Sequence, residues 1–258
     1  MYNLNKDSIL SKLNYPISIC IESSVSSTNE VLKDIANKGE TEGYVLISKH
    51  QTKGKGRLNR QFFSENGLYF SILLRPDLSL DNAVMITVAA AVAVAKAIDK
   101  VCKKPCQIKW VNDIFLNDKK ICGILTESKV KSNSKLEYAI LGIGINILPP
   151  KNDFPNDIKH IAGTLFENES IDNETVNSLI AEIINVFFYY YQNLTNKDYM
   201  PDYKNLSYII GKKINIIQNN KSIPATAVDI DDNAQLIAKL SDGTKTIVSS
   251  GEISIRLA

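Results

Sequence analysis

The amino-acid sequence predicts an α+β fold, in which a mixed central sheet with packed helices is followed by a small all-β barrel. Up to Pro201, stretches with helical spacing alternate with buried apolar runs. From Gly211 to Ala258 only short alternating segments occur, separated by turn residues, and no helical pattern fits. A chain of 258 residues is long enough for one large domain and a small one. We therefore expect a catalytic-size domain over residues 1–208 and a small β domain over residues 209–258.

The first predicted helix follows a short β-branched strand that begins after Pro16. Ser27 and Glu30 form a capping-box pattern, in which the serine hydroxyl accepts from a backbone N–H and the glutamate reaches back. Apolar residues at helical spacing continue the pattern. Gly39 is suited to the position where the helix ends.

Two apolar segments then flank a basic loop. The segments "YVLISKHQ" (44–51) and "GLYFSILLRP" (67–76) each predict a strand, and Pro76 ends the second one. Between Gln51 and Arg60 the chain holds four basic residues and two glycines. This loop is the most informative feature of the sequence for function.

Two longer helices are predicted in the rest of the first domain. The alanine-rich stretch Ser79–Cys102 has small residues that allow close packing on a sheet, and Asp81 is its expected N-cap. Apolar residues spaced by 3.6 predict an amphipathic helix over Thr175–Leu194.

The remaining elements are predicted to be strands. Residues 106–130 indicate two strands joined by a turn at Asn117–Asp118, and residues 136–148 indicate one buried strand. The turns of the C-terminal domain are predicted at Asn219–Asn220, Asp231–Asn233 and Asp242–Gly243.

Composition argues against several classes of function. The formal net charge is only +2, so no global field attracts nucleic acid or an anionic membrane. The four cysteines form no C-x-x-C pair and the two histidines stand apart, so neither a zinc site nor a disulfide framework is expected. The N-terminus lacks the layout of a signal peptide, and the apolar run Ala83–Ala95 is too short to span a bilayer. We expect a cytoplasmic protein.

The basic loop nearly matches a dinucleotide fingerprint, with Gly54, Gly56 and then Asn59 where glycine is required. That motif must open a helix, whereas this loop leads into a strand, and the Gly-Lys-Ser/Thr of a Walker A loop is absent. A solvated hairpin loop, a nucleic-acid-binding patch and a glycine-bearing anion site remain open on the residues alone. The glycines favour the anion site, because they let backbone N–H groups approach a ligand closely.

Six short motifs in order resolve this choice. They are "SSTN", "GKGRLNR", "KWVNDIF", "KKICGILTE", "LGIGIN" and "SGEISIR". Together, from about Ser23 to the C-terminus, they resemble the bacterial biotin protein ligase (biotin–[acetyl-CoA-carboxylase] ligase) family. The resemblance implies a class II synthetase-like catalytic domain with a C-terminal SH3-like β-barrel. It also implies the short form without an N-terminal DNA-binding domain, and a homodimer is compatible with it.

The implied enzyme is an ATP-dependent, AMP-forming ligase. It would convert biotin and ATP to biotinyl-5′-AMP and transfer biotin to a lysine of the biotin carboxyl carrier domain of acetyl-CoA carboxylase or a related carboxylase. Mg²⁺ would accompany ATP, and neither nucleic acid nor membrane is an expected partner. Alternative readings are a lipoate-protein ligase-like acyltransferase and, from a different class, a nucleic-acid-binding module.

The resemblance also implies the site residues. The catalytic groups would be Lys109, whose ammonium would bridge the biotin carboxylate and the α-phosphate, and Arg57, which would hold the adenylate. Contacts with biotin would come from Ser27, Thr28, Asn29, Gln51, Lys55, Gly56, Arg57, Tyr69, Lys109, Gly123, Gly142 and Gly144. Contacts with ATP would come from Lys55, Arg57, Arg60, Phe62, Lys109, Asn112 and Asn146. No cluster of metal ligands is predicted, and Mg²⁺ would bind with ATP, near Asn146.

Structural roles compete with several of these assignments. Residues 27–29 could only cap a helix, Lys109 could point to solvent, and Tyr69 could be an ordinary core tyrosine. The family loop commonly reads GRGRxGRxW, whereas this chain has Lys55 for arginine, Asn59 for glycine and Phe62 for tryptophan. Because asparagine tolerates a left-handed backbone, Asn59 is expected to preserve the loop. In "KWVND", Val111 replaces the usual proline.

Overall fold

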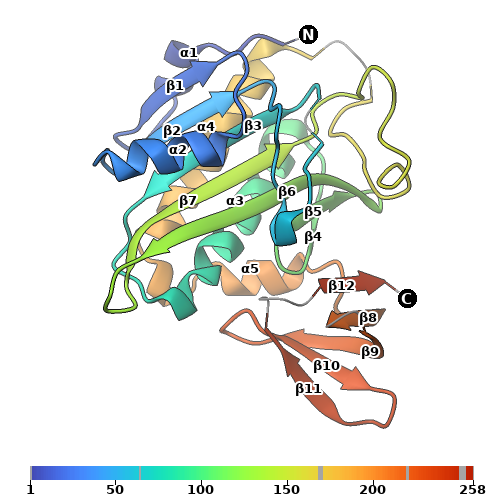
Figure 1. The fold of residues 1–258 in the computed structure, drawn as a ribbon. Coiled ribbons are helices and arrows are strands. Elements are labelled where there is room, and N and C mark those ends of the chain that lie inside the picture. The colour runs from blue at the N-terminus through green and yellow to red at the C-terminus, as the bar shows by residue number, and fades with distance from the viewer. Residues whose placement is uncertain (1, 64, 168–170, 219–220, 250–253, 258) are drawn as a thin grey trace.

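The computed structural model describes residues 2–63, 65–167, 171–218, 221–249 and 254–257. Its larger unit is built on a seven-stranded sheet (Figure 1). The strands lie in the order β1 (Ser18–Glu22), β2 (Tyr44–Ser48), β3 (Leu68–Leu74), β7 (Leu136–Ile145), β6 (Lys119–Val130), β5 (Asp113–Leu116) and β4 (Gln107–Lys109). β1 and β2 are parallel, and every other neighbouring pair is antiparallel. The predicted mixed sheet is confirmed.

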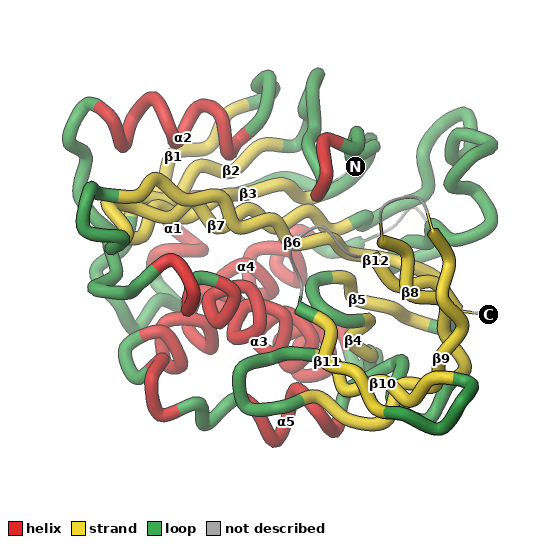
Figure 2. Tube along the Cα trace, turned by 60° about the horizontal axis from the view of Figure 1, so that its bottom comes forward, coloured by secondary structure: helices red, strands yellow, loops and turns green. Residues whose placement is uncertain are grey.

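Helices cover the two faces of this sheet unequally. Figure 2 shows α2 (Thr28–Asn37) on one face and α3 (Val84–Cys102), α4 (Asn173–Tyr191) and α5 (Met200–Asn205) on the other. The short helix α1 (Lys6–Leu10) packs against α4. The backbone of α2 packs mainly on β2, β3 and β7. The glycine-bearing ends of β6 and β7 therefore remain accessible to the loop between β2 and β3.

Small buried side chains allow α3 to pack closely on the sheet. Thirteen of its residues are buried, and most of them are alanine or valine. Small side chains allow close approach of the helix backbone, and the resulting cluster continues into α4 and all the way to β8. No helix of the described residues is long and apolar enough to cross a membrane.

The helix α2 begins where the capping pattern predicts. The predicted capping box itself is wrong. Ser27 is the N-cap residue of α2, yet its side chain makes no capping hydrogen bond. Instead the backbone N–H of Thr28 donates to Oε1 of Gln51 at 2.8 Å. The Glu30 carboxylate pairs with lysines rather than with the N-cap backbone. Gly39, with φ of +93°, lies directly after the helix end as expected.

Two further expectations need correction. Asp81 is not the N-cap of α3, because the chain forms a 3₁₀ turn over Leu80–Asn82 and α3 then starts after Ala83. Residues 106–130 form three strands rather than two, since the backbone leaves the sheet at residues 110–112. The turn predicted at Asn117–Asp118 is confirmed, and both residues have positive φ, as a two-residue hairpin turn requires.

The C-terminal part is a five-stranded antiparallel sheet, as its alternating pattern predicts. Its strands lie in the order β11 (Lys245–Val248), β10 (Leu236–Leu240), β9 (Lys221–Ile230), β8 (Lys213–Gln218) and β12 (Ser254–Leu257). The predicted turn at Asn219–Asn220 lies outside the described residues. Buried residues of this sheet, such as Ile214 and Leu236, belong to the same apolar cluster as Trp110 of the larger unit. The boundary at residue 208 stays a prediction.

Candidate active site

The N-terminus of α2 is joined to β3 and to the residues after β2 through four side chains. Oε1 of Gln51 accepts from the Thr28 backbone N–H at 2.8 Å and lies 3.2 Å from its hydroxyl. The Ser71 hydroxyl lies 2.7 Å from the Thr28 hydroxyl and 2.6 Å from Oδ1 of Asn29. Because a hydroxyl carries one hydrogen, Ser71 donates to only one of these oxygens at a time. The structure thus brings Thr28, Asn29 and Gln51 together, as the motif predicts.

Asn29 is held in place from both sides of its amide. Its Nδ2 donates to Oε2 of Glu127 at 2.8 Å and to the Leu125 carbonyl at 3.3 Å. Gly142 makes room for this side chain, since a Cβ there would lie 2.2 Å from Oδ1 of Asn29. The glycine predicted to clear space for biotin therefore clears space for a predicted biotin contact.

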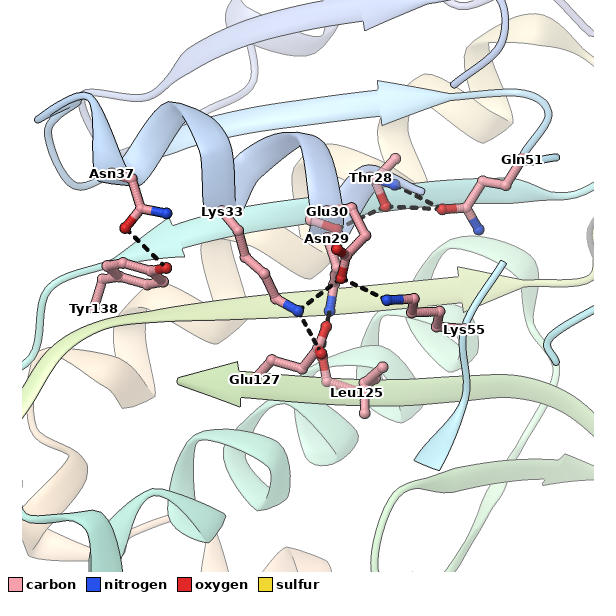
Figure 3. A network of polar contacts seen from close by, with 11 residues as sticks. Thr28, Asn29, Glu30, Lys33, Asn37, Gln51, Lys55, Leu125, Glu127 and Tyr138 are labelled. Atoms are coloured by element: carbon pink, nitrogen blue, oxygen red, sulfur yellow. Dashed lines mark hydrogen bonds and ion pairs between the residues drawn. The ribbon is translucent and has the colours of Figure 1, made fainter. Parts of the chain in front are cut away.

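A chain of ion pairs connects α2, β6 and the basic loop (Figure 3). Nζ of Lys33 lies 2.7 Å from Glu30 and 2.6 Å from Glu127, and Nζ of Lys55 lies 2.8 Å from Glu30. Hydrogen bonds to Lys33 and then Lys55 lower the pKa of Glu30. Burial alone would lower the pKa of Lys33, but the bonds to Glu127 and Glu30 outweigh it and raise the pKa. Lys55 is thereby tied beside the N-terminal turn of α2.

The loop closes on itself between Gly54 and Phe62. The Phe62 N–H donates to the Gly54 carbonyl at 2.9 Å, and the Gly56 N–H donates to the Arg60 carbonyl at 2.8 Å. A short 3₁₀ turn over Arg57–Asn59 forms the tip. The left-handed residue is Leu58, with φ of 55°, and not the Asn59 that the family comparison singles out. A left-handed conformation costs a non-glycine residue roughly 1–2 kcal/mol, so the tip carries local strain.

Arg57 points from this loop to the sheet. Its Nη1 donates to Oδ1 of Asn112 at 3.2 Å, and Nδ2 of the same asparagine donates to the Ile124 carbonyl at 2.7 Å. Burial lowers the pKa of the Arg57 guanidinium, and nearby Arg60 acts in the same direction while Asp113 opposes it. Arginine still remains charged, because its ordinary pKa lies far above neutral pH. A partly buried cation is thus held against the segment that follows Lys109.

The Phe62 ring lies over two glycines, Gly123 of the "KKICGILTE" motif and Gly144 of the "LGIGIN" motif. A Cβ at Gly123 or at Gly144 would lie 2.9 Å from this ring. Tyr69, fully buried on β3, meets the ring edge-on with the centroids 6.2 Å apart. Lys120 pairs with Asp113 at 2.7 Å and its Nζ lies 6.0 Å from the ring centroid. The departure from tryptophan at this position still supplies an aromatic surface.

Lys109 ends β4, where it is the register partner of Asp113. It is partly buried, and its Nζ lies 5.5 Å from the centroid of the Phe115 ring. The backbone then turns away from the sheet through Trp110 and Val111, whose peptide bond is cis. The Trp110 ring is buried and contributes packing.

Two predicted ATP contacts stand apart from the others. Nδ2 of Asn146 donates to the Gly163 carbonyl at 3.0 Å and so ties the chain after β7 to the segment before residue 165. Arg60 is exposed at the side of the loop. Within the residues that the structure describes, no three or more His, Cys, Asp or Glu side chains lie close enough to hold a metal ion.

An open cleft of about 710 Å³ adjoins the site at the end of β2. Its walls include Gln51 and Phe62 together with Lys49, His50 and Lys151. The cleft therefore combines an aromatic surface, an amide and basic side chains, a lining suited to an anionic ligand with a planar ring.

Sequence reasoning missed several residues that support the site. Glu127 and Ser71 hold Asn29, and Asp113 pairs with Lys120. Lys120 lies on β6, and its chain neighbour Lys119 instead donates to the His160 carbonyl at 2.7 Å. Alternation along β6, which sends adjacent lysines to opposite faces, is the signal that could have separated them.

The sequence of this chain matches two protein-family models and several known proteins. The model of the biotin/lipoate A/B protein ligase family matches residues 21–146, and that of the biotin protein ligase C terminal domain matches residues 209–256. The chain is 34% identical over 233 residues to the bifunctional ligase/repressor BirA of Bacillus subtilis (strain 168), covering 88% of this chain and 70% of that protein. The chain belongs to the biotin/lipoate A/B protein ligase family.

Other members of the family agree with this assignment. The chain is 25% identical to the biotin–[acetyl-CoA-carboxylase] ligase of Mycobacterium tuberculosis (strain ATCC 25618 / H37Rv), covering 88% of this chain and 85% of that one. A solved structure of the biotin protein ligase from Aquifex aeolicus in complex with biotin and ATP superimposes with a TM-score of 0.76 at 27% identity. That match covers 93% of this chain and 99% of the other. These relatives support a biotin protein ligase over a lipoate ligase, and the predicted fold class is confirmed.

Proposed function

We propose that this chain activates biotin with ATP to biotinyl-5′-AMP and then transfers the biotinyl group to a lysine of a biotin carboxyl carrier domain. In the first step, a carboxylate oxygen of biotin bonds to the α-phosphorus of ATP and the bond to pyrophosphate breaks. In the second, the neutral lysine amine attacks the acyl carbon, AMP leaves with the electrons of the broken C–O bond, and the amine loses a proton. Both steps pass through anionic transition states, which fixed positive charge stabilises.

One observation carries the proposal. The loop Gly54–Phe62 holds the partly buried cation Arg57 beside Asn112 and lays the Phe62 ring over glycines of β6 and β7. The same chain superimposes on a biotin- and ATP-bound ligase over 93% of its length. A loop that places charge and an aromatic ring over a glycine-lined sheet is suited to bind a charged, ring-bearing adenylate.

The residues are assigned the following roles in this proposal. Thr28, Asn29 and Gln51 offer hydroxyl and amide groups to the ureido ring of biotin, which needs both donors and acceptors. Lys55 and Arg57 wrap the carboxylate and later the acyl phosphate. Lys109 neutralises charge that develops between the carboxylate and the α-phosphate. Residues Ser27, Gly56, Tyr69, Gly123, Gly142 and Gly144 remain predicted biotin contacts, and Arg60, Phe62, Asn112 and Asn146 remain predicted ATP contacts.

The described residues do not form a metal site of their own, because no suitable cluster of carboxylates or histidines occurs among them. We therefore derive no step through Mg²⁺, which would be carried by the ATP phosphates. Homodimer formation likewise stays a prediction.

The test is pyrophosphate exchange into ATP, with biotin and lipoate offered separately. Reversal of the first step incorporates labelled pyrophosphate into ATP only when the correct acid is bound. We expect exchange with biotin and none with lipoate. Exchange with lipoate alone would favour the acyltransferase alternative, and no exchange with either acid would refute the proposed activity.

The second half-reaction needs a separate test. Purified enzyme that holds radiolabelled biotinyl-5′-AMP is mixed with a carrier domain and with the same domain lacking its acceptor lysine. We expect label to move only to the intact domain. Transfer to both domains at one rate would show release of the adenylate into solution rather than directed transfer.

A further inference from the structure

The backbone segment Lys109–Asn112 is held by two hydrogen bonds from outside the central sheet. The Tyr203 hydroxyl on α5 donates to the Val111 carbonyl at 3.0 Å. The Trp110 indole N–H donates to the Ala234 carbonyl of the C-terminal sheet at 2.8 Å. Both donors are buried, with Tyr203 only 1% exposed. A buried hydrogen bond to a backbone carbonyl is costly to lose, because the carbonyl is then left without a partner.

The strand before this segment is held by the same part of the chain. The Ile108 N–H donates to the Leu206 carbonyl at 2.7 Å, and the Tyr208 N–H donates back to the Ile108 carbonyl at 2.8 Å. The Tyr208 ring also stacks on Phe115 of the adjacent strand, with the ring centroids 4.8 Å apart. Residues 203–208 and the C-terminal sheet therefore form one support behind β4.

The two ends of the segment carry residues of the proposed chemistry. Lys109 is its first residue, and Asn112, its last, accepts a hydrogen bond from Arg57. Asn112 is also tied to β6 by reciprocal bonds with Ile124, at 2.7 Å and 3.0 Å. A shift of the Val111 carbonyl would therefore move both proposed catalytic cations relative to each other.

We propose that Tyr203 is a positioning residue for adenylate formation, which fixes the backbone of Lys109–Asn112 through the Val111 carbonyl, with the Trp110–Ala234 bond as second anchor. This inference rests on the proposed function. It assigns the C-terminal sheet and α5 a part in the first half-reaction, although they contribute no predicted substrate contact.

Electrostatics support a role as donor for the tyrosine. Burial raises the pKa of Tyr203 far above the assay range, although the charge of nearby Arg57 acts against this. The hydroxyl consequently stays protonated and donates at any pH at which the enzyme is assayed. A change caused by its removal should therefore be independent of pH.

The experiment compares Tyr203→Phe with Tyr199→Phe in biotin-dependent pyrophosphate exchange. Tyr199 is a matched control, because its buried hydroxyl also donates to a backbone carbonyl, that of Leu194 at 3.1 Å, away from the site. Both variants lose one oxygen from the interior. All assays are run below the lowest midpoint of thermal unfolding, so that only folded enzyme is compared.

We expect Tyr203→Phe to lower kcat about tenfold at every pH while the KM values for biotin and ATP change less than about twofold. The bound adenylate should also dissociate faster, whereas Tyr199→Phe should retain wild-type values. Equal kcat values for the two variants would overturn the inference. Wild-type enzyme without exchange would instead refute the proposed function, so the two failures are distinguishable.

A second variant covers the case in which Tyr203→Phe does not fold. Trp110→Phe keeps an aromatic ring but removes the indole N–H that binds the Ala234 carbonyl. The same loss of kcat at nearly constant KM is expected. A folded Trp110→Phe enzyme with wild-type kcat would contradict the proposed support from the C-terminal sheet.

Discussion

Nη1 of Arg57 donates to Oδ1 of Asn112 across 3.2 Å, which joins the tip of the β2–β3 loop to the segment that follows Lys109. The two residues are 55 positions apart in the chain. The contact sets the position of a partly buried guanidinium whose pKa is lowered by desolvation. It makes the tip of the loop part of the candidate site.

Replacement of Arg57 should shorten the life of the enzyme-bound intermediate. In Arg57→Gly, we expect biotinyl-5′-AMP to be released roughly tenfold to a hundredfold faster, because a charge-assisted hydrogen bond contributes about 1.5–3 kcal/mol. The measurement is retention of labelled adenylate after rapid gel filtration. Lys53→Gly is the control, since it removes an exposed cation from the same loop. Equal retention in both variants would contradict the role of Arg57.

Replacement of Lys109 should impair the chemical step itself. For Lys109→Ala we expect biotin-dependent pyrophosphate exchange to fall by about two to three orders of magnitude, as for removal of a charge that stabilises a transition state. Lys100→Ala, which removes an exposed lysine paired with Glu182, is expected to be unaffected. Near-normal exchange in Lys109→Ala would remove this residue from the catalytic set.

The glycines of β7 should affect the two substrates differently. A Cβ at Gly142 would displace Asn29, whereas a Cβ at Gly144 would press on the Phe62 ring. We expect Gly142→Ala to raise the KM for biotin about tenfold, which corresponds to roughly 1.4 kcal/mol. Gly144→Ala should act mainly on the KM for ATP. Identical effects of both variants on both substrates would contradict the separate roles of Asn29 and Phe62.

The pairing of Glu30 with Lys55 should restrain the loop. Glu30→Gln is expected to speed tryptic cleavage between residues 53 and 60, because the neutral amide binds the lysine more weakly. Glu174→Gln, which breaks the exposed pair with Lys12, serves as the control. The effect should shrink at high salt, since both partners are partly exposed. A cleavage rate equal to that of the control would refute the restraint.

The same restraint should depend on pH in a defined direction. Hydrogen bonds to Lys33 and Lys55 lower the pKa of Glu30 below its ordinary value of 4.5. Its contribution is therefore present above about pH 4.5 and is lost as the pH falls through the lowered pKa. Amide exchange of the loop, corrected for intrinsic rates, should differ between wild type and Glu30→Gln at neutral pH and converge in acid. A difference that does not narrow as the pH falls below 4.5 would be inconsistent with this pairing.

Local patterns predict most of the elements but not the contacts that join them. The strand and helix assignments around Gly39, Pro76 and the Asn117–Asp118 turn are confirmed, because each depends on the conformational limits of a residue and its neighbours. The capping box at Ser27 is wrong because the Glu30 carboxylate pairs with Lys33 and with Lys55 of the distant basic loop instead of the N-cap backbone. Such a competitor cannot be inferred from the helix sequence alone.

The same limit applies to the candidate site. Motif order predicts that Thr28, Asn29 and Gln51 come together, and the structure brings them together. Motif order does not predict that Leu58 rather than Asn59 adopts the left-handed backbone, because the conformation of the loop tip depends on the closure of the whole loop. Motif order also does not predict that Glu127 fixes Asn29, because that contact depends on how α2 lies over β6.

The apolar cluster that runs without interruption from α3 to the C-terminal sheet has a consequence for folding. Ile214 and Leu236 are fully buried in it, together with residues of the larger sheet. Because the two parts share one interior, we expect them to melt as a single cooperative unit, with equal calorimetric and van't Hoff enthalpies. Deletion of residues 209–258 would then yield an aggregation-prone fragment with exposed apolar surface instead of a smaller stable enzyme.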